Sequence, residues 1–401
     1  MRVLLVHNYY GSTAPSGENK VFEAERTMLE RHGETVEVFT RHSDEIRGKG
    51  LWGLLKGALC TIGNPFAARA LKKKIREFRP DVVHFHNTFP LISPLAIRTA
   101  KKSGAKVVMT LHNYRMVCAA GIPMRGGKVC RECFVISEQS NNRTIRTILP
   151  AICHRCYRGS LMATLPLALN IWFYRKRWTK WVDKFIVLSE FQKRIMIECG
   201  LPDEKGGVKG NFIQSNNQNI PNNRTIRSGV VFVGRLSDEK GVKTLLKAWQ
   251  IFEQSEQSNN RTILTLIGDG VQRAEYESLA TGLNVRFLGK LSHDEVLKEL
   301  SGAKLLVMPS EWWETFGLVV IEAAMCGTPA VVSDLGALPD LVQDGRCGEV
   351  FKAGDAHALA GAIRRLLERT DYDEVCKNCR EEAETRYAEE ANYRQLMDLY
   401  S

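Results

Sequence analysis

Two glutamates, Glu314 and Glu322, bracket the apolar run FGLVVI within EWWETFGLVVIEAAMCGTP, residues 311–329. A strand-like segment, AKLLVMPS (303–310), precedes them, and FGLVVIEAAMCG (316–327) has the apolar face of a helix. Glu314 should therefore precede the helix, and Glu322 should lie about two turns into it. An unpaired buried carboxylate is costly, and the two hydroxyls of a ribose would satisfy Glu322. A salt-bridged pair on a buried helix is the alternative, but we interpret both carboxylates as facing one ligand.

A second group of residues could bind phosphate. In GRLSDEKG (234–241), Gly234 permits a tight turn after a strand, and Arg235 and Lys240 follow that turn. Arginine donates bidentate hydrogen bonds and lysine is a point charge, which together suit a diphosphate; a solvated basic loop is the alternative. In IGDG (267–270), Gly268 would let the backbone approach a ligand closely. The first amides of the helix after Glu314 would stabilise an anion as well.

These residues are placed by strands that alternate with helices along most of the chain. The first half has five strand-like runs, at residues 2–8, 35–40, 81–87, 106–113 and 184–189. The second half has five more, at residues 229–234, 262–268, 284–289, 303–310 and 329–334. Apolar strands that alternate with helices predict parallel α/β sheets covered on both faces. We therefore expect two doubly wound, Rossmann-like domains facing across a cleft that binds the ligand.

The expected domain boundaries follow from this alternation. An acceptor-side domain is predicted at residues 1–208, with a cysteine-rich insertion at 114–160. A nucleotide-binding domain is predicted at residues 209–386, and the helix at 387–401 is expected to pack back on the first domain. The identical octapeptide EQSNNRTI at 138–145 and 256–263, with NNRTI again at 222–226, is interpreted as loop insertions without an assigned function.

Bulk composition is that of a globular protein, with 44% hydrophobic and 25% charged residues. The chain begins directly with the strand-like RVLLVHN, so no secretory signal is expected, and a cytoplasmic location follows. The net charge of +11 suits nucleic acid, an anionic membrane surface or phosphorylated ligands. No nucleic-acid-binding motif accompanies that charge, so nucleic acid is not expected as a partner.

Two stretches combine apolar and basic residues. SLMATLPLALNIWFYRKRWTKWVDKF (160–185) suits a membrane surface, although a core-packed helix with a solvated basic end explains it equally well. LWGLLKGALC (51–60) is a second such stretch, which favours membrane contact. Peripheral attachment to the inner face of the plasma membrane is therefore considered.

Four cysteines, Cys118, Cys130, Cys133 and Cys156, predict a metal site within the insertion. Cys130 and Cys133 form a C-x2-C knuckle, whose spacing lets two thiolates bind one tetrahedral ion. Cys153 could replace Cys156, and His154 is another candidate ligand. Free thiols and, less readily in a reducing compartment, a disulfide are the alternatives. We predict a structural zinc ion that keeps this loop-rich segment ordered.

These motifs together resemble those of retaining nucleotide-sugar glycosyltransferases of family 4, which have the GT-B fold. The second half carries GRLSDEKG, IGDG, FLG (287–289), the E-x7-E pair and GTPAVVSDLGALPDLVQDGRCGEVF (327–351). The first half carries a Ser16-Gly17 loop, DVVHFHN (81–87), TLHNYR (110–115) and FIVLSEFQK (185–193). The loop has one glycine, Gly17, where many members have two.

The resemblance implies a role for each matched residue. Arg235 and Lys240 would bind the donor diphosphate, Glu322 the ribose, and Glu314 and His112 the donor sugar. The backbone amides of Phe316, Gly317 and Leu318 would bind phosphate, and Gly234, Gly268 and Gly17 would approach the donor. Catalysis without a metal cofactor would proceed by front-face attack, in which the leaving diphosphate helps to deprotonate the acceptor.

The function expected from the sequence is transfer of a sugar with retention of anomeric configuration. The donor would be a UDP, GDP or ADP sugar, and the acceptor a glycan or a lipid-linked, cell-envelope or polysaccharide precursor. A sugar-nucleotide epimerase or a phosphorylase on the same fold is the alternative. A non-catalytic binding protein is less compatible with the intact E-x7-E pair.

Overall fold

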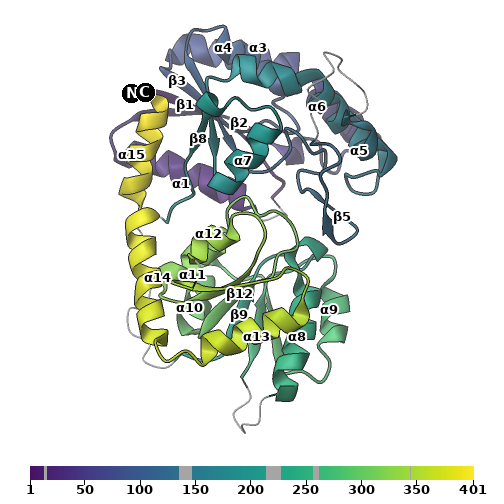
Figure 1. Ribbon diagram of the computed structural model, residues 1–401. Coiled ribbons are helices and arrows are strands. Elements are labelled where there is room, and N and C mark those ends of the chain that lie inside the picture. The colour runs from purple at the N-terminus through teal and green to yellow at the C-terminus, as the bar shows by residue number, and fades with distance from the viewer. Residues whose placement is uncertain (13–15, 135–146, 214–226, 256–261, 344) are drawn as a thin grey trace. The chain divides into compact units, whose positions relative to one another are not determined.

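The computed structural model describes residues 1–401 except 13–15, 135–146, 214–226, 256–261 and 344. The chain forms two compact units, each built around one parallel sheet (Figure 1). Unit 1 comprises residues 1–123, 130–210 and 393–401, and unit 2 comprises residues 124–129 and 211–392. The EQSNNRTI and NNRTI repeats lie outside the described residues, apart from Thr262 and Ile263.

The sheet of unit 1 has the strand order β2-β1-β3-β4-β7-β8, and every neighbouring pair is parallel. Both alternating sets of side chains in β3 are buried, so both faces of this sheet are covered. The strands are β1 (Arg2–Tyr9), β2 (Thr35–His42), β3 (Val82–Asn87), β4 (Lys106–Leu111), β7 (Lys184–Val187) and β8 (Gly206–Val208).

The sheet of unit 2 has the order β11-β10-β9-β12-β13-β14, again with every pair parallel. Its strands are β9 (Val230–Val233), β10 (Leu264–Ile267), β11 (Val285–Gly289), β12 (Leu305–Met308), β13 (Ala330–Ser333) and β14 (Gly348–Phe351). Numbered within the unit, this order is 3-2-1-4-5-6, the dinucleotide-binding arrangement, whereas unit 1 follows the flavodoxin-like order. The predicted fold class is confirmed.

Helices connect the strands in both units. Those of unit 1 are α1 (Gly17–Arg31), α2 (Gly50–Ile62), α3 (Pro65–Phe78), α4 (Pro94–Lys101), α5 (Leu149–Cys153), α6 (Leu161–Trp181) and α7 (Glu190–Glu198). Those of unit 2 are α8 (Val242–Ser255), α9 (Arg273–Leu279), α10 (His293–Gly302), α11 (Leu318–Met325), α12 (Leu338–Val342), α13 (Ala356–Leu367) and α14 (Tyr372–Arg386). The last helix, α15 (Glu389–Tyr400), has its first four residues in unit 2 and its remainder in unit 1.

The ten strands expected from the sequence are all present, and two further parallel strands, β8 and β14, complete the sheets. The insertion at 114–160 also contains a short antiparallel hairpin, β5 (Met124–Arg125) and β6 (Lys128–Val129). Among the described residues, no helix has the length and apolar character needed to cross a membrane.

Helix α6 combines a buried aromatic face with exposed basic side chains. Tyr174 and Trp178, in its aromatic and basic half, are buried in unit 1. Arg175 donates hydrogen bonds to the carbonyls of Cys133 and Phe134 at 2.9 and 3.0 Å. The rings of Tyr174 and Trp178 therefore belong to the protein core, whereas Lys176 and Lys180 are exposed to solvent.

Candidate functional site

The candidate donor site of unit 2 lies where the strand order of the sheet reverses, between β9 and β12. In doubly wound sheets, ligands bind beyond the carboxyl ends of the strands at this switch point. The loop that carries Arg235 and Lys240 follows β9, and the loop that carries Glu314 follows β12. The topology therefore brings the predicted cations and the first predicted carboxylate to the same edge of the sheet.

Glu314 is the centre of this cluster. Its Oε1 atom accepts hydrogen bonds from Lys240 Nζ at 2.6 Å, Ser310 Oγ at 2.7 Å and Trp312 Nε1 at 2.9 Å. The Lys240 ammonium also lies 5.7 Å from the centre of the Trp312 ring. Glu314 is buried, and these donors compensate the loss of water from its charge. A carboxylate held in this way is a poor nucleophile but a precise anchor for Lys240.

Arg235 is arranged differently from Lys240. One of its terminal nitrogens lies 2.7 Å from Oε1 of Glu239, which also accepts from the Ser237 hydroxyl at 2.7 Å. The Arg235 side chain remains 54% exposed, whereas that of Lys240 is 14% exposed. Arg235 can therefore reorient toward a ligand at low cost, while Lys240 is fixed in advance.

Two glycines at this edge have conformations that exclude a side chain. Gly268 has φ +133°, and a Cβ atom there would lie 1.9 Å from the carbonyl oxygen of Gly234. Gly317 has φ +119° and is the N-cap of α11, where a Cβ would lie 2.9 Å from Leu338. At each of these two positions the backbone lies closer to its neighbour than any residue with a side chain allows.

The second predicted carboxylate is placed differently from expectation. Because Gly317 has a left-handed conformation, α11 begins at Leu318, and Glu322 lies only about one turn into it, so the expected depth of about two turns is wrong. Glu322 Oε1 lies 3.7 Å from Nδ1 of His293 on α10. Phe316 packs against Tyr387 with ring centres 5.8 Å apart, which leaves its backbone as the part that could bind phosphate. That Glu314 and Glu322 share one ligand stays a prediction.

In unit 1, the predicted residue His112 directly follows β4. Its Nε2 lies 3.0 Å from Nδ1 of His86 on β3, and Nε2 of His86 lies 3.1 Å from Oε1 of Glu25 on α1. A carboxylate can only accept, so His86 donates through Nε2, and its Nδ1 accepts from Nε2–H of His112. Burial, followed by the neighbouring His86 and His7, holds the pKa of His112 well below its usual value. His112 is therefore neutral, and its proton lies on Nε2 when His86 is neutral as well.

Glu25 anchors this chain of histidines. Lys209 Nζ lies 3.0 Å from its Oε2, and Nδ1 of His84 lies 3.0 Å from its Oε1. His84 also bonds Thr110 through Nε2 at 2.8 Å. Burial alone would raise the pKa of Glu25, but Lys209 and the two histidines hold that pKa well below its usual value. The ion pair is almost fully excluded from solvent.

Glu25, His84 and His86 are also the one group of three possible metal ligands whose atoms lie within 4.8 Å of one another in the described part of the chain. The residues around them do not fit a metal ion, because the Lys209 ammonium already neutralises Glu25 from 3.0 Å. A cation placed among these ligands would meet a fixed positive charge. The group is therefore a structural network rather than a metal site.

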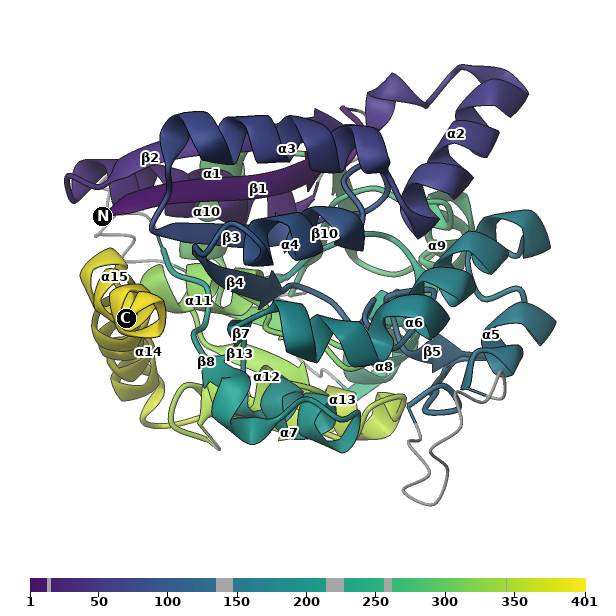
Figure 2. The same cartoon turned by 90° about the horizontal axis from the view of Figure 1, so that it is seen from above.

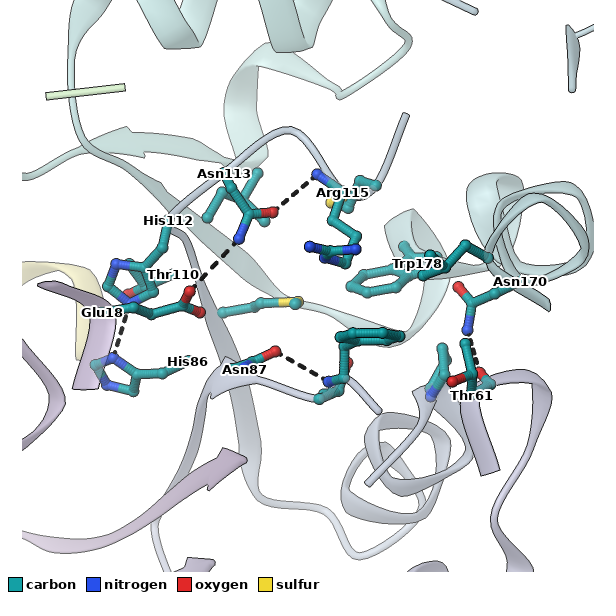
Figure 3. Close-up of a pocket in the computed structure, with 17 residues that line it drawn as sticks. Glu18, Thr61, His86, Asn87, Thr110, His112, Asn113, Arg115, Asn170 and Trp178 are labelled. Carbon is teal, nitrogen blue, oxygen red and sulfur yellow. Dashed lines mark hydrogen bonds between the residues drawn. The ribbon is translucent and has the colours of Figure 1, made fainter. Parts of the chain in front are cut away.

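His86 and His112 border a small cavity of about 50 Å³ in unit 1 (Figure 3). Glu18, in the first turn of α1, lines the same cavity, and its Oε2 accepts from Tyr10 Oη at 3.0 Å and Asn113 Nδ2 at 3.5 Å. Burial raises the pKa of Glu18 to about 7, against the opposing effects of Tyr10, Arg115 and Asn113. Glu18 is therefore a carboxyl of this cavity that titrates near neutral pH.

Further lining residues come from several other elements of unit 1. Arg115 follows Asn113 and lies 4.5 Å from the centre of the Phe89 ring. Thr61 belongs to α2, and Asn170 and Trp178 belong to α6. An aromatic ring, amides, a carboxyl and a guanidinium around one cavity are groups that hydrogen-bond and stack on polar, hydroxylated molecules.

Gly17, which the sequence placed near a phosphate, is the exposed first residue of α1. A Cβ atom added there would meet no atom within 4 Å. Close packing within the protein therefore requires glycine at Gly268 and Gly317, whereas the described surroundings of Gly17 impose no such requirement. The role predicted for Gly17 is not tested by this geometry.

The predicted zinc ligands lie in one region of unit 1. Cys133 and Cys156 pack against the same apolar cluster of α5 and α6, whereas Cys153 is exposed. Burial first, and then neighbouring thiols, raise the pKa of Cys118 to about 12 and of Cys133 to about 11. The sulfur atoms do not form a set of three within 4.8 Å in the described residues. The zinc site stays a prediction, with Cys156 favoured over Cys153 by its position.

Several residues of the site were not found from the sequence. Two histidines alternate on the otherwise apolar strand DVVHFHN, and polar side chains on a buried strand are a signal that could have identified His86. Glu18 starts the helix that follows β1, which places it at the same sheet edge as His112. Glu25 and Lys209 give no such signal, because they are far apart in the sequence and meet only in the fold.

Comparison with known families agrees with this architecture. The model of Glycosyltransferase Family 4 matches residues 17–215, and that of Glycosyl transferases group 1 matches residues 214–386. Together these matches extend over both sheets, and the strand orders are those of two Rossmann-like domains. The chain therefore belongs to the glycosyltransferases of the GT-B fold.

Individual curated proteins match this chain at moderate sequence identity and over only part of their own length. The sulfoquinovosyl transferase SQD2 of Arabidopsis thaliana is 34% identical over 318 residues, which are 78% of this chain and 54% of that protein. A D-inositol 3-phosphate glycosyltransferase of Nocardioides is 31% identical over 188 residues, 43% of this chain and 41% of that protein. The chain thus spans about half or less of these curated relatives.

Solved structures share the fold over nearly the whole chain. HepE of Anabaena, in complex with UDP, has a TM-score of 0.63 and 18% identity, with 99% of both chains covered. Sucrose-phosphate synthase of Thermosynechococcus elongatus has a TM-score of 0.64 and 21% identity, with 100% of this chain and 98% of that chain covered. At these identities the likeness concerns the fold.

Replacing Lys209 by methionine should leave Glu25 as an unpaired buried charge and lower the free energy of unfolding by about 3–5 kcal/mol. The double variant Lys209→Met/Glu25→Gln should recover part of that loss, because the charge is gone. Calorimetric unfolding measures both effects. Lys193→Met, which breaks the exposed pair with Asp203 at 2.7 Å, is the control and should change the free energy by less than about 1 kcal/mol. A Lys209→Met effect as small as the control would contradict the role of the buried pair.

The elevated pKa of Glu18 makes stability depend on pH in a defined window. The folded state raises this pKa from 4.5 to about 7, so its stabilisation is complete below about pH 4.5 and is lost as pH rises toward 7. Glu18→Gln should therefore gain thermal stability relative to the original protein between these pH values, and the difference should level off above them. Melting temperatures of both proteins across this range measure the difference; a difference independent of pH would refute the assignment.

Proposed function

We propose that the protein transfers a sugar from a nucleoside diphosphate sugar to a hydroxyl group of an acceptor, with retention of anomeric configuration. The observation that carries this proposal is the cluster of Lys240, Arg235 and Glu314 at the switch point of unit 2. Cations there suit a diphosphate, and a buried carboxylate beside them suits the hydroxyls of the attached sugar. The solved complexes of HepE with UDP and with UDP-glucose make UDP sugars the first donors to test.

In this proposal, the bond between the anomeric carbon and the diphosphate oxygen breaks, and the diphosphate keeps the electron pair. Lys240, Arg235 and the first amides of α11 stabilise the negative charge that develops on it. Glu314 holds Lys240 in place and accepts a hydrogen bond from the sugar. The acceptor hydroxyl attacks from the face that the diphosphate leaves, and its proton passes to the departing phosphate oxygen, so no enzyme nucleophile is needed.

We place the attacking hydroxyl of the acceptor, rather than the whole acceptor, at the cavity of unit 1, whose volume is about 50 Å³. His112 is neutral and fixed by His86, so it acts as a hydrogen-bonding group near the reacting sugar rather than as a cation. Glu18 and Asn113 provide further polar contacts for a hydroxylated acceptor. A glycan or a lipid-linked cell-envelope or polysaccharide precursor has such hydroxyls, and both are retained as acceptor classes.

Donor binding and transfer can be tested separately. Thermal unfolding with UDP, GDP and ADP sugars identifies the donor, because a ligand of the folded state raises the melting temperature. Incubation of that donor with and without glycan or lipid-linked acceptors then identifies the reaction, and the anomeric configuration of the product is read by NMR. Conversion of the donor in the absence of an acceptor would indicate an epimerase, and donor-independent cleavage of a glycan by phosphate a phosphorylase.

Removing a phosphate-binding cation should weaken the diphosphate and spare the nucleoside. We expect Lys240→Ala and Arg235→Ala each to raise the Kd of the nucleoside diphosphate by about 10–100-fold, since a charge-assisted hydrogen bond contributes about 1.5–3 kcal/mol. Calorimetric titration with diphosphate and nucleoside provides the comparison. Lys243→Ala, an exposed lysine of α8, is the matched control and should leave both affinities unchanged. Equal losses for the two ligands would argue against a diphosphate site.

The two glutamates should affect different steps. Glu322→Gln is expected to weaken donor binding, because a ribose hydroxyl needs a charged acceptor, whereas Glu314→Gln should mainly lower kcat, because Lys240 loses its partner. Each effect should be about tenfold or more, as for the loss of one charge-assisted hydrogen bond. Steady-state kinetics together with donor titration distinguishes the two. Unchanged donor affinity and unchanged kcat in both variants would show that the carboxylates do not share the donor.

A further inference from the structure

Helix α2 exposes its large apolar side chains and buries its small ones. Leu51 is 84% exposed and Trp52 is 81% exposed, and three further leucines of this helix, Leu54, Leu55 and Leu59, are also exposed. Leu51, Trp52, Leu55 and Leu59 recur at the spacing of one helix face. The side of α2 that faces the protein consists of Gly53, Gly57 and Thr61. This is the reverse of the usual helix on a globular protein.

The packing of α2 on unit 1 fixes this orientation. A Cβ atom on Gly53 would lie 2.1 Å from the carbonyl oxygen of Ile46, and one on Gly57 would lie 2.8 Å from Cδ1 of the same residue. Helix α2 also contacts α6, where Asn170 donates to the Thr61 carbonyl at 2.6 Å. No larger side chain fits on the inner face, so α2 cannot rotate to bury its leucines. Figure 2 shows α2 at the margin of unit 1, outside the layer of strands.

The elements that adjoin α2 extend the apolar surface. Phe66, at the start of α3, is 74% exposed, and Met162, at the start of α6, is 81% exposed. Leu161 and Leu165 of α6 are exposed as well. Large apolar side chains exposed on neighbouring helices are typical of a surface that contacts a partner or a membrane.

Within the two segments that form this surface, the charged side chains are all basic, and acidic residues such as Glu45 and Glu77 lie just outside them. Residues 46–76, which include α2 and most of α3, contain eight lysines and arginines and no acidic residue. Residues 147–182, which include α6, contain six basic residues and no acidic one. The net charge of the chain is +11, so the two segments account for its positive balance. A partner that covers this surface must therefore be apolar at its centre and anionic around it.

We propose that the α2–α6 surface docks on an anionic lipid bilayer. Helix α2 would lie in the plane of the interface, with Leu51, Trp52 and Leu55 at the boundary of the acyl chains and Lys49 and Lys56 among the headgroups. An apolar helix face flanked by lysines has this mode of binding, and tryptophan favours the interface. A protein partner or a second copy of the chain would cover the leucines, but the lack of acidic residues in both segments favours a surface of negative charge.

Helices α2 and α6, which form this surface, also contribute residues to the cavity of unit 1. Thr61 of α2 and Asn170 of α6 line that cavity together with Glu18 and His112. Docking would therefore bring the proposed acceptor cavity to the level of the lipid headgroups. This consequence rests on the proposed function and indicates a lipid-linked acceptor, whereas the docking itself does not depend on it.

Sedimentation with lipid vesicles tests the proposal on the full chain. The protein should bind vesicles of phosphatidylcholine mixed with phosphatidylglycerol, bind vesicles of pure phosphatidylcholine far less, and dissociate as salt is raised. Trp52→Ser/Leu55→Ser should lower partitioning to the anionic vesicles by about tenfold or more, because two apolar side chains no longer leave water. Val271→Ser/Leu279→Ser removes two exposed apolar residues of unit 2 and is the matched control, with unchanged partitioning expected.

Equal melting temperatures and equal donor affinity of the variant and the original protein would show that fold and donor site are intact, which separates this test from that of the proposed function. Failure of the original protein to bind anionic vesicles would overturn the proposal. So would a dimer in solution that Trp52→Ser/Leu55→Ser dissociates, because the surface would then bind a second copy.

Discussion

A parallel sheet must return its chain from the end of one strand to the start of the next through a crossover, and these crossovers are right-handed. In both units some strands are added on one side of the first strand and others on its other side. At the point where the strand order reverses, the connections after two neighbouring strands run to opposite faces of the sheet. In unit 2 this point lies between β9 and β12, and in unit 1 between β1 and β3. The loops after these strands separate there, and every functional group assigned above stands at or beside one of them.

The charged residues at the ligand-binding edge of the unit 2 sheet are arranged differently from those at the corresponding edge of the unit 1 sheet. In unit 2, Lys240 is paired with the buried Glu314 and the exposed Arg235 with Glu239, so both cations are balanced by carboxylates before an anion arrives. In unit 1, Glu25 is fully compensated by Lys209 and by histidines, and no net charge reaches the cavity from it. A neutral, oriented His112 is the product of that compensation. One edge is suited to a charged leaving group and the other to neutral hydroxyls.

The sequence alone was enough to predict the features that depend on regular residue patterns, such as strands and helices. Strand and helix periodicity predicted the two sheets, and the position of Arg235 and Lys240 after a strand predicted a cationic edge. The Lys240–Glu314 pair was not predictable, because it joins loops that only the strand order brings together. Glu322 was placed too deep because the left-handed Gly317 delays the start of α11. The edge strand β8 was missed because its three residues have no readable period.

Helix α2 illustrates a limit of periodicity in another way. The pattern of apolar residues in LWGLLKGALC identifies an apolar face but not the side toward which it points. A helix face made of large apolar residues usually packs on the protein core, because burying each such side chain stabilises the fold by about 1.5–3 kcal/mol. Here Gly53 and Gly57 leave no room for that arrangement, and Ile46 occupies the space that a side chain would need. The leucines of α2 are therefore available for a contact outside the fold, and the neighbouring Lys49 and Lys56 would favour a surface of negative charge.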